Sequence, residues 1–263
     1  MKSLNGAELA GYIKENQAYL ARGLLARGVK PRLVIIRNSK SPVIEKYVSL
    51  KKGYGEDIGV EVEDWLREDL EAAVNEANTR DDIHGVIVQL PLEGDTNVED
   101  VVNSLAPAKD VDGLGEKAEF DSATATAINW LLAGYNIDLT GMSIALVGHG
   151  RLVGGPLEKM WRDSGYQVRT FRRGDDLSEL KSFDVVVSAT GVPHLIKSEM
   201  IKVGAVVVDA GTASEGGVLV GDLDDSVRER TDLTAITPKI GGVGPLTVTA
   251  LFEHVLIAAG KVG

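Results

Sequence analysis

Tyr47 and Lys51 are the first residues in this sequence whose types and spacing could do chemistry. They stand four residues apart in a segment that is predicted to be a helix, so both side chains lie on one helix face. That face borders an apolar stripe, where a lysine has two possible uses. The amine can extend along the stripe to solvent, or it can be held in a pocket because a reaction needs it.

The helix that must position this pair is predicted from its two ends. Ser41 can cap the start, and Pro42 suits the first helical position. Gly53 and Gly55 are expected to end the helix, because glycine commonly follows the last helical turn.

A glycine-rich turn in the second half of the chain indicates nucleotide binding. Gly148, Gly150 and Gly154 follow an apolar strand and open a helix. Glycines there let backbone N–H groups approach a pyrophosphate at the helix N-terminus. The next predicted strand ends in Arg172 and Arg173, where NAD enzymes usually have an acid. Two guanidiniums suit a ribose 2′-phosphate. NADP is therefore favoured over NAD, and both over a solvated basic turn.

Two further segments contain polar residues that could belong to a site. Gln89 lies at the carboxyl end of the apolar strand 84–92, where open α/β sheets bind ligands, although it could equally cap the sheet. The segment PAKDVDGL (107–114) has two acids and a lysine, and by composition alone it is an ordinary surface turn. The histidines show no metal-ligand spacing, so no metal site is expected. They are His84, His149, His194 and His254.

The order of apolar segments predicts an α/β protein of two domains with parallel sheets. Strands alternate with helices in both halves, which favours right-handed crossovers. A stretch of small residues separates the halves near residue 120. The expected helices are 4–27, 67–78, about 125–135 and 246–260, and the expected strands are 32–38, about 60–62, 84–92, 142–147, 166–173, 183–190 and 204–211.

Composition narrows the class of protein. Apolar residues make up 44% and charged residues 25% of the 263 residues, the balance of a soluble globular protein. The net charge of -11 is spread along the chain, which argues against nucleic acid or an anionic membrane as a partner. The lack of cysteine excludes disulfides, thiol catalysis and cysteine-based metal centres. With no signal-peptide pattern and no apolar run of about 18 residues, a cytoplasmic setting is expected.

Several segments that occur in a fixed order resemble one family. They are YVSLKK, GVIVQLPL, PAKDVDGL, the glycine turn before VGGP, VVSATGVP, VVVDAGT and TPKIGGVGPLT. Over nearly its whole length the chain resembles the methylenetetrahydrofolate dehydrogenase/cyclohydrolase family. The resemblance implies a folate cleft between an N-terminal catalytic domain and a Rossmann-like NADP-binding domain. It also implies two reactions, NADP-dependent oxidation of 5,10-methylene-tetrahydrofolate to the methenyl form and hydrolysis of that product to 10-formyl-tetrahydrofolate.

The resemblance assigns expected roles to individual residues. Lys51 would be the catalytic amine, Tyr47 would pack on the pterin side, Gln89 would hydrogen-bond the lysine, and Asp112 would hold the polar edge of the pterin. The other expected substrate-binding residues are Leu90, Pro91, Gly242, Gly244 and Pro245. The expected cofactor-binding residues are Gly148, His149, Gly150, Arg151, Arg172, Arg173, Thr190, Gly191 and Thr212.

The chain departs from the family pattern at three places. Gly148-His149-Gly150 stands where Gly-Arg-Ser is usual. Residues 122–125 replace a proline-rich loop, and Lys239-Ile240 replaces a pair such as Val-Pro before the double glycine. These departures all fall in or after residue 122, so the folate side is matched more closely than the cofactor side.

The expected domains are 1–120, joined by the C-terminal helix 246–263, and 121–245, and a homodimer is implied by the resemblance. The residues alone leave two other functions possible. One is a shikimate- or amino-acid-type dehydrogenase on a similar fold, which would leave PAKDVDGL and GGVGP unexplained. The other is a folate-binding homologue with weakened dehydrogenase activity.

Overall fold

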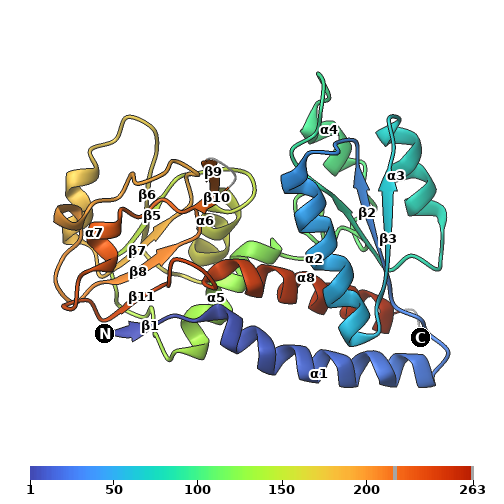
Figure 1. Ribbon diagram of the computed structural model, residues 1–263, viewed down its shortest axis with the longest axis horizontal. Helices are drawn as coiled ribbons and strands as arrows, with labels where there is room; N and C mark the ends of the chain where they lie inside the picture. Colours follow the sequence, from blue (N-terminus) through green and yellow to red (C-terminus); the bar gives the residue numbers. More distant parts are fainter. Residues whose placement is uncertain (216–217, 262–263) are drawn as a thin grey trace. The chain divides into compact units, whose positions relative to one another are not determined.

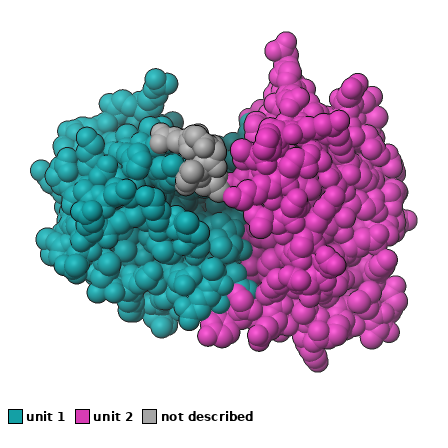
Figure 2. Space-filling model, in the orientation of Figure 1, with its two compact units in different colours: residues 1–10, 124–247 teal, residues 11–123, 248–263 magenta. Residues whose placement is uncertain are grey.

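A computed structural model describes residues 1–215 and 218–261. The chain divides into two compact units, coloured separately in Figure 2. Unit 1 contains residues 1–10 and 124–247, and unit 2 contains residues 11–123 and 248–263. Helices α1 (Gly6–Ala26) and α8 (Val243–Gly260) each run from one unit into the other.

Unit 2 is built on a parallel sheet with the strand order β3-β2-β4. Strands β2 and β3 lie side by side in Figure 1. Its elements are β2 (Arg32–Arg37), α2 (Pro42–Ile58), β3 (Glu61–Leu66), α3 (Leu70–Thr79), β4 (Gly85–Val88) and α4 (Val98–Asn103). The chain passes from β2 through α2 to β3 on one side, and β4 pairs on the other side of β2. Ligands bind at such a reversal of strand order, outside the carboxyl ends of the strands.

One face of this sheet packs on α3 and α4 through a single apolar core. The core residues are Val34, Ile36, Val86 and Val88 from the sheet, Leu70, Ala73, Val74 and Ala77 from α3, and Val101 and Val102 from α4. Because both strands flanking the reversal contribute to this core, their carboxyl ends are held in fixed register.

Helix α2 is longer than the sequence indicates. Its start is as predicted, with Ser41 accepting a hydrogen bond from Ile44 N (3.3 Å) and Pro42 in the first turn. The helix does not end at Gly53 or Gly55, however, but continues to Ile58 and ends at Gly59, whose φ is 82°. Gly55 serves packing instead, because a Cβ there would lie 2.8 Å from the backbone oxygen of Val60.

Unit 1 contains a parallel sheet with the order β1-β11-β8-β7-β5-β6. Its elements are β1 (Lys2–Ser3), α5 (Ala123–Gly134), β5 (Ile144–Val147), α6 (Gly154–Asp163), β6 (Val168–Phe171), β7 (Val185–Ser188), β8 (Val206–Asp209), β9 (Ala213–Glu215), β10 (Val218–Val220), α7 (Asp225–Arg228), β11 (Ala235–Ile236) and the 3₁₀ helices Leu177–Ser182 and Ser198–Met200. Strand β5 pairs with β6 on one side and β7 on the other, which makes the β5–β7 boundary this unit's reversal of strand order.

Two parts of the expected domain division change. Residues 1–10 were assigned to the N-terminal domain, but β1 pairs in parallel with β11, so they belong to unit 1. The C-terminal helix begins at Val243 rather than 246, and residues 262–263 of the expected range lie outside the described residues. Helix α8 is long and apolar enough to cross a membrane by length and composition alone, and 61% of that window is buried in the protein as a core helix.

Candidate active site

Lys51 is held at the carboxyl end of the sheet in unit 2. Its Nζ donates a hydrogen bond to Gln89 Oε1 at 2.8 Å. Gln89 N donates to the backbone oxygen of Ile36 (2.8 Å), and Gln89 Nε2 donates to that of Leu90 (3.0 Å). The side-chain amide of Gln89, which accepts the hydrogen bond from Lys51, is therefore held at the ends of both β2 and β4. This is the point where the strand order reverses.

Asp112 reaches the same place from a different segment. Val86 N donates to the Lys109 oxygen (2.7 Å), and Val86 forms a parallel bridge with Asp110, so this segment runs beside β4. Burial lowers the pKa of Lys51, and the charge of Asp112 opposes that change. Burial raises the pKa of Asp112 to about 6, against the effect of Lys51 and with that of Asp110. Burial therefore disfavours the charged forms of both groups, and each charge partly stabilises the other.

Tyr47 lies on the same side of α2 as Lys51. The Nζ of Lys51 is 5.8 Å from the centre of the Tyr47 ring, and burial raises the pKa of the tyrosine. The ring is partly exposed, so it offers a flat apolar face next to the amine. A planar heterocycle could pack on such a face while a polar edge meets Asp112.

The charged residues of the PAKDVDGL segment have separate tasks. Lys109 Nζ donates to the backbone oxygens of Ala77 (3.0 Å), Asn78 (3.0 Å) and Arg80 (2.7 Å), which stabilises the end of α3. The buried carboxylate of Asp110 accepts from the N–H groups of the following turn, Gly113 (3.0 Å) and Gly115 (2.7 Å). The segment is therefore not the ordinary surface turn that its composition suggests, and Asp112 is the acid that faces Lys51.

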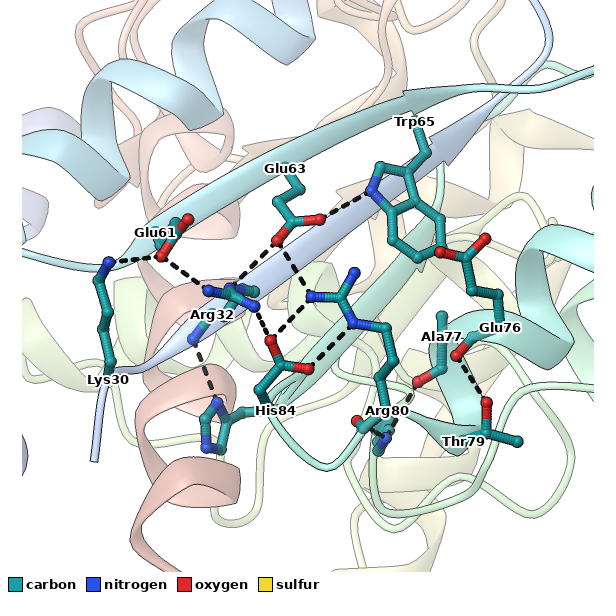
Figure 3. Close-up of polar contacts among 12 residues, drawn as sticks. Lys30, Arg32, Glu61, Glu63, Trp65, Glu76, Ala77, Thr79, Arg80 and His84 are labelled. Atoms are coloured by element: carbon teal, nitrogen blue, oxygen red, sulfur yellow. Dashed lines mark hydrogen bonds and ion pairs between the residues drawn. The ribbon is translucent and has the colours of Figure 1, made fainter. Parts of the chain in front are cut away.

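Another charged cluster of unit 2 lies at the opposite, amino end of the sheet (Figure 3). Arg32 pairs with Glu61 (3.1 Å) and Glu63 (3.2 Å), and Glu63 also pairs with Arg80 (3.5 Å). The backbone N–H of Arg32 donates to Nδ1 of His84 (3.2 Å), which fixes the ring in a structural role. Since these charges neutralise one another across β2 and β3, the cluster stabilises strand pairing and is not a candidate for catalysis.

The glycine turn of unit 1 follows β5 at that unit's reversal of strand order. Gly148 has φ of 100°, and a Cβ there would lie 2.5 Å from the backbone oxygen of Ala189. A Cβ on Gly154 would overlap the backbone oxygen of Gly148. At Gly150 a Cβ would meet no atom of the described residues within 4 Å. The first and last glycines therefore allow close backbone packing, and the middle one leaves open space over the turn.

His149 turns back towards α6. Its Nδ1 lies 2.8 Å from Glu158 Oε2, and its ring passes 3.8 Å from where a Cβ on Gly155 would stand. The residue before α6 is Val153, whose apolar side chain cannot accept a hydrogen bond from the first helical N–H groups. Gly155 N–H donates to the backbone oxygen of Gly150 (2.9 Å) and Pro156 has no N–H, so the positive end of the helix dipole is what suits this helix start to an anionic group.

The remaining cofactor candidates lie after neighbouring strands of the same sheet. Arg172 and Arg173 follow β6 with exposed side chains, and Arg151 lies in the glycine turn. Thr190 and Gly191 follow β7, where Gly191 has φ of 68° and a Cβ would lie 3.5 Å from the backbone oxygen of Thr212. Thr212 itself follows β8, so the carboxyl ends of four strands, β5, β6, β7 and β8, bring these residues into one unit.

The expected substrate-binding residues fall in both units. Tyr47, Leu90, Pro91 and Asp112 belong to unit 2, and the Leu90–Pro91 peptide bond is cis. Gly242, Gly244 and Pro245, at the start of α8, belong to unit 1.

Comparison with known proteins identifies the family of the chain. Residues 4–112 match the model of the tetrahydrofolate dehydrogenase/cyclohydrolase catalytic domain, and residues 122–262 match that of its NAD(P)-binding domain. The chain belongs to the tetrahydrofolate dehydrogenase/cyclohydrolase family. The predicted family, two-domain α/β fold and enzyme class are therefore confirmed, and a shikimate- or amino-acid-type dehydrogenase is excluded.

Relatives in this family match from end to end. The bifunctional protein FolD of Aquifex aeolicus is 37% identical over 273 residues, covering 96% of this chain and 93% of that protein. The crystal structure of the bifunctional FolD enzyme of Campylobacter jejuni has a TM-score of 0.94 at 31% identity and covers 99% of both chains. The enzyme of Trypanosoma brucei, complexed with NADP and an inhibitor, has a TM-score of 0.90 at 28% identity and covers 98% of this chain and 97% of that one.

The residues of unit 1 fit the NADP cofactor of this family. The close-packed glycines leave the turn open at Gly150, the helix that follows begins without a polar cap, and two guanidiniums lie exposed one strand away. Backbone N–H groups, a helix N-terminus and arginines are the donors that a dinucleotide with an extra phosphate requires.

Sequence reasoning missed the support behind Asp112. His254 on α8 donates from Nδ1 to the backbone oxygen of Val111 (2.8 Å), and its ring stacks on Phe120 with 4.8 Å between centres. Burial lowers the pKa of His254, and the bond to a carbonyl oxygen requires a proton on Nδ1. No local spacing marks such a residue, because its partner is 143 positions away in the sequence.

Proposed function

We propose that this enzyme oxidises 5,10-methylene-tetrahydrofolate with NADP and hydrolyses the 5,10-methenyl product to 10-formyl-tetrahydrofolate, with Lys51 as the proton-transferring amine. The observation that carries this proposal is the 2.8 Å hydrogen bond from Lys51 to Gln89, with Asp112 as the neighbouring opposite charge.

The chemistry of hydrolysis needs a group with the properties of Lys51. Water adds to the cationic methenyl carbon and must lose a proton, and the ring nitrogen must gain one when its bond to that carbon breaks. A buried amine whose pKa is lowered can accept the first proton and return it for the second. Gln89 accepts a hydrogen bond from the amine and fixes its direction, while Asp112 would hold the pterin edge.

Hydride transfer makes a different demand. NADP supplies the hydride acceptor, and the chain must supply a rigid pose without an acid or base at the reacting carbon. Gly148, Gly150 and Gly154 would receive the pyrophosphate, and Thr190, Gly191 and Thr212 would line the neighbouring strand ends. Arg172 and Arg173 would bind the 2′-phosphate.

Binding measurements with the two dinucleotides test the cofactor side. Replacing Arg172 and Arg173 together with alanine should raise the Kd for NADP by about 10- to 100-fold, because charge-assisted hydrogen bonds to the 2′-phosphate are lost. The Kd for NAD should stay unchanged. Arg169→Ala is the matched control, since Arg169 is on the same strand and pairs with Glu179 at 2.7 Å. Equal weakening of both dinucleotides would overturn the assignment.

Spectroscopic assays of the purified protein test the two activities. The absorbance of reduced cofactor follows the dehydrogenase, and the absorbance of methenyl-tetrahydrofolate follows the cyclohydrolase. Hydrolysis without reduced cofactor would favour the alternative, a folate-binding homologue with weakened dehydrogenase activity. A homodimer in the cytoplasm is part of the proposal and rests on the family resemblance, and sedimentation of a monomer at micromolar concentration would contradict the dimer.

A further inference from the structure

Unit 1 contains a buried carboxylate that the proposed reactions do not use. Asp222 follows β10 and is fully buried. Its Oδ2 accepts hydrogen bonds from Ser188 Oγ (2.6 Å) and from the backbone N–H of Thr190 (2.7 Å). Ser188 is the last residue of β7, so one carboxylate oxygen fixes the point where that strand turns.

The surrounding backbone is shaped to admit this carboxylate. A Cβ on Gly211 would overlap the carboxylate of Asp222, and a Cβ on Gly221 would overlap that of Asp209. Asp209, the last residue of β8, accepts from the N–H of Asp222 (3.0 Å) and pairs with Arg228 (2.6 Å). Asp222 is therefore anchored to the end of β8 and reaches across to the end of β7.

The turn that Asp222 fixes is in contact with the glycine turn. The oxygen of Ala189 lies where a Cβ on Gly148 would be only 2.5 Å away. A shift of the turn after β7 would thus change the space that Gly148 leaves at the end of β5. It would also move Thr190 and Gly191.

We propose that Asp222 is a positioning residue for NADP, acting through the Thr190 N–H to hold the turn Ala189–Gly191 against the glycine turn. This inference rests on the proposed assignment of that turn to the cofactor site. Asp222 itself touches no cofactor in this scheme. Its role is to fix the backbone that does.

Calorimetry of NADP binding tests the role of Asp222. Asp222→Ala leaves two buried donors without their acceptor, so the Kd for NADP should rise about 10- to 100-fold. Asp222→Asn keeps a carbonyl oxygen that can accept from both donors, and its Kd should stay within about threefold of wild type. The rate of hydrolysis at saturating methenyl-tetrahydrofolate should be unchanged in both variants, because the proposed proton-transfer residues Lys51, Gln89 and Asp112 are in unit 2.

A matched control lies at the other end of the same strand. Asp184, just before β7, accepts from Ser143 N (2.9 Å) and Ser143 Oγ (2.7 Å). Asp184→Ala should lower thermal stability as Asp222→Ala does but should leave the Kd for NADP unchanged. Equal NADP binding in Asp222→Ala and wild type, or equal weakening in Asp184→Ala or Asp222→Asn, would overturn the proposal.

Hydrogen exchange of the ligand-free wild-type protein gives a test that no folding defect can obscure. The Thr190 amide should be protected, because it donates to a buried carboxylate. Exchange at the rate of an unstructured amide would refute the proposal. Failure of wild-type protein to bind NADP would instead refute the proposed cofactor function, so the two failures are distinguishable.

Discussion

Replacing Lys51 with methionine separates proton transfer from packing. Methionine keeps much of the apolar length of the side chain and removes the amine that donates to Gln89 at 2.8 Å. Loss of a well-placed acid–base group costs about 10²- to 10⁴-fold in rate, which is about 3 to 5 kcal/mol in the barrier. Folding should be unaffected or improved, since burial disfavours the charged amine and lowers its pKa.

The assay is the rate of hydrolysis of methenyl-tetrahydrofolate, with two matched variants. Lys52→Met changes a lysine that points about 100° away on the helix and pairs its half-exposed amine with Asp64 at 3.1 Å. Asp64 keeps its 2.7 Å pair with Arg37 in this variant, so hydrolysis should be normal. Lys51→Arg keeps the positive charge but provides a guanidinium that does not lose its proton, so hydrolysis should stay low.

The outcomes decide whether Lys51 transfers protons or only packs on the helix face. Equal hydrolysis in Lys51→Met and Lys52→Met would refute proton transfer by Lys51 and leave its hydrogen bond to Gln89 with a structural role only. Full activity of Lys51→Arg would show that charge alone is needed and would refute proton transfer. Formation of reduced cofactor should survive in Lys51→Met better than hydrolysis does, because that step depends on position rather than on an amine.

Asp112→Asn should raise stability at pH 7, measured by urea unfolding. The pKa of this carboxyl is about 6 in the folded protein and near 3.8 in the unfolded chain, so above pH 6 its charge lowers the free energy of unfolding by up to about 3 kcal/mol. The stability gained by Asp112→Asn should therefore vanish as the pH falls towards 4. A gain that does not depend on pH would contradict this. Tyr54→Phe should cost about 1–3 kcal/mol of unfolding free energy, because the hydroxyl donates to Oε1 of the fully buried Gln17 (2.7 Å); unchanged stability would refute the bond. Gly148→Ala should greatly lower the melting temperature and NADP binding, whereas Gly150→Ala should fold normally, and equal stability of the two would refute the close approach at Gly148.

Much of the arrangement around Lys51 was predictable because it follows from local periodicity. A spacing of four puts Tyr47 and Lys51 on one helix face whatever surrounds the helix. An apolar run that ends at Gln89 indicates a strand end, where ligands of parallel sheets bind. The end of α2 was predicted wrongly. A glycine such as Gly55 commonly marks a helix end, but here a glycine is required because the backbone of Val60 leaves no room for a Cβ.

Features that depend on distant partners were not predictable from the sequence. Strands β1 and β11 each have two residues, too few to show any alternation. They exist because β11 pairs with β8 on one side and with β1 on the other. Asp222 looks like any acid near a turn, and only the folded chain brings its carboxylate to Thr190.

The segment PAKDVDGL shows why composition alone could not single out Asp112, its proposed functional residue. In the sequence, Lys109, Asp110 and Asp112 have the pattern of a solvated turn. In the fold, each has a different partner. Three backbone oxygens at the end of α3 satisfy the ammonium of Lys109, and backbone N–H groups of the next turn satisfy Asp110. The charge that opposes Asp112 belongs to Lys51, a side chain from another element. A carboxylate whose counter-charge comes from another side chain can exchange that partner for a ligand, whereas one that is held by backbone N–H groups of its own turn cannot do so without unfolding the turn.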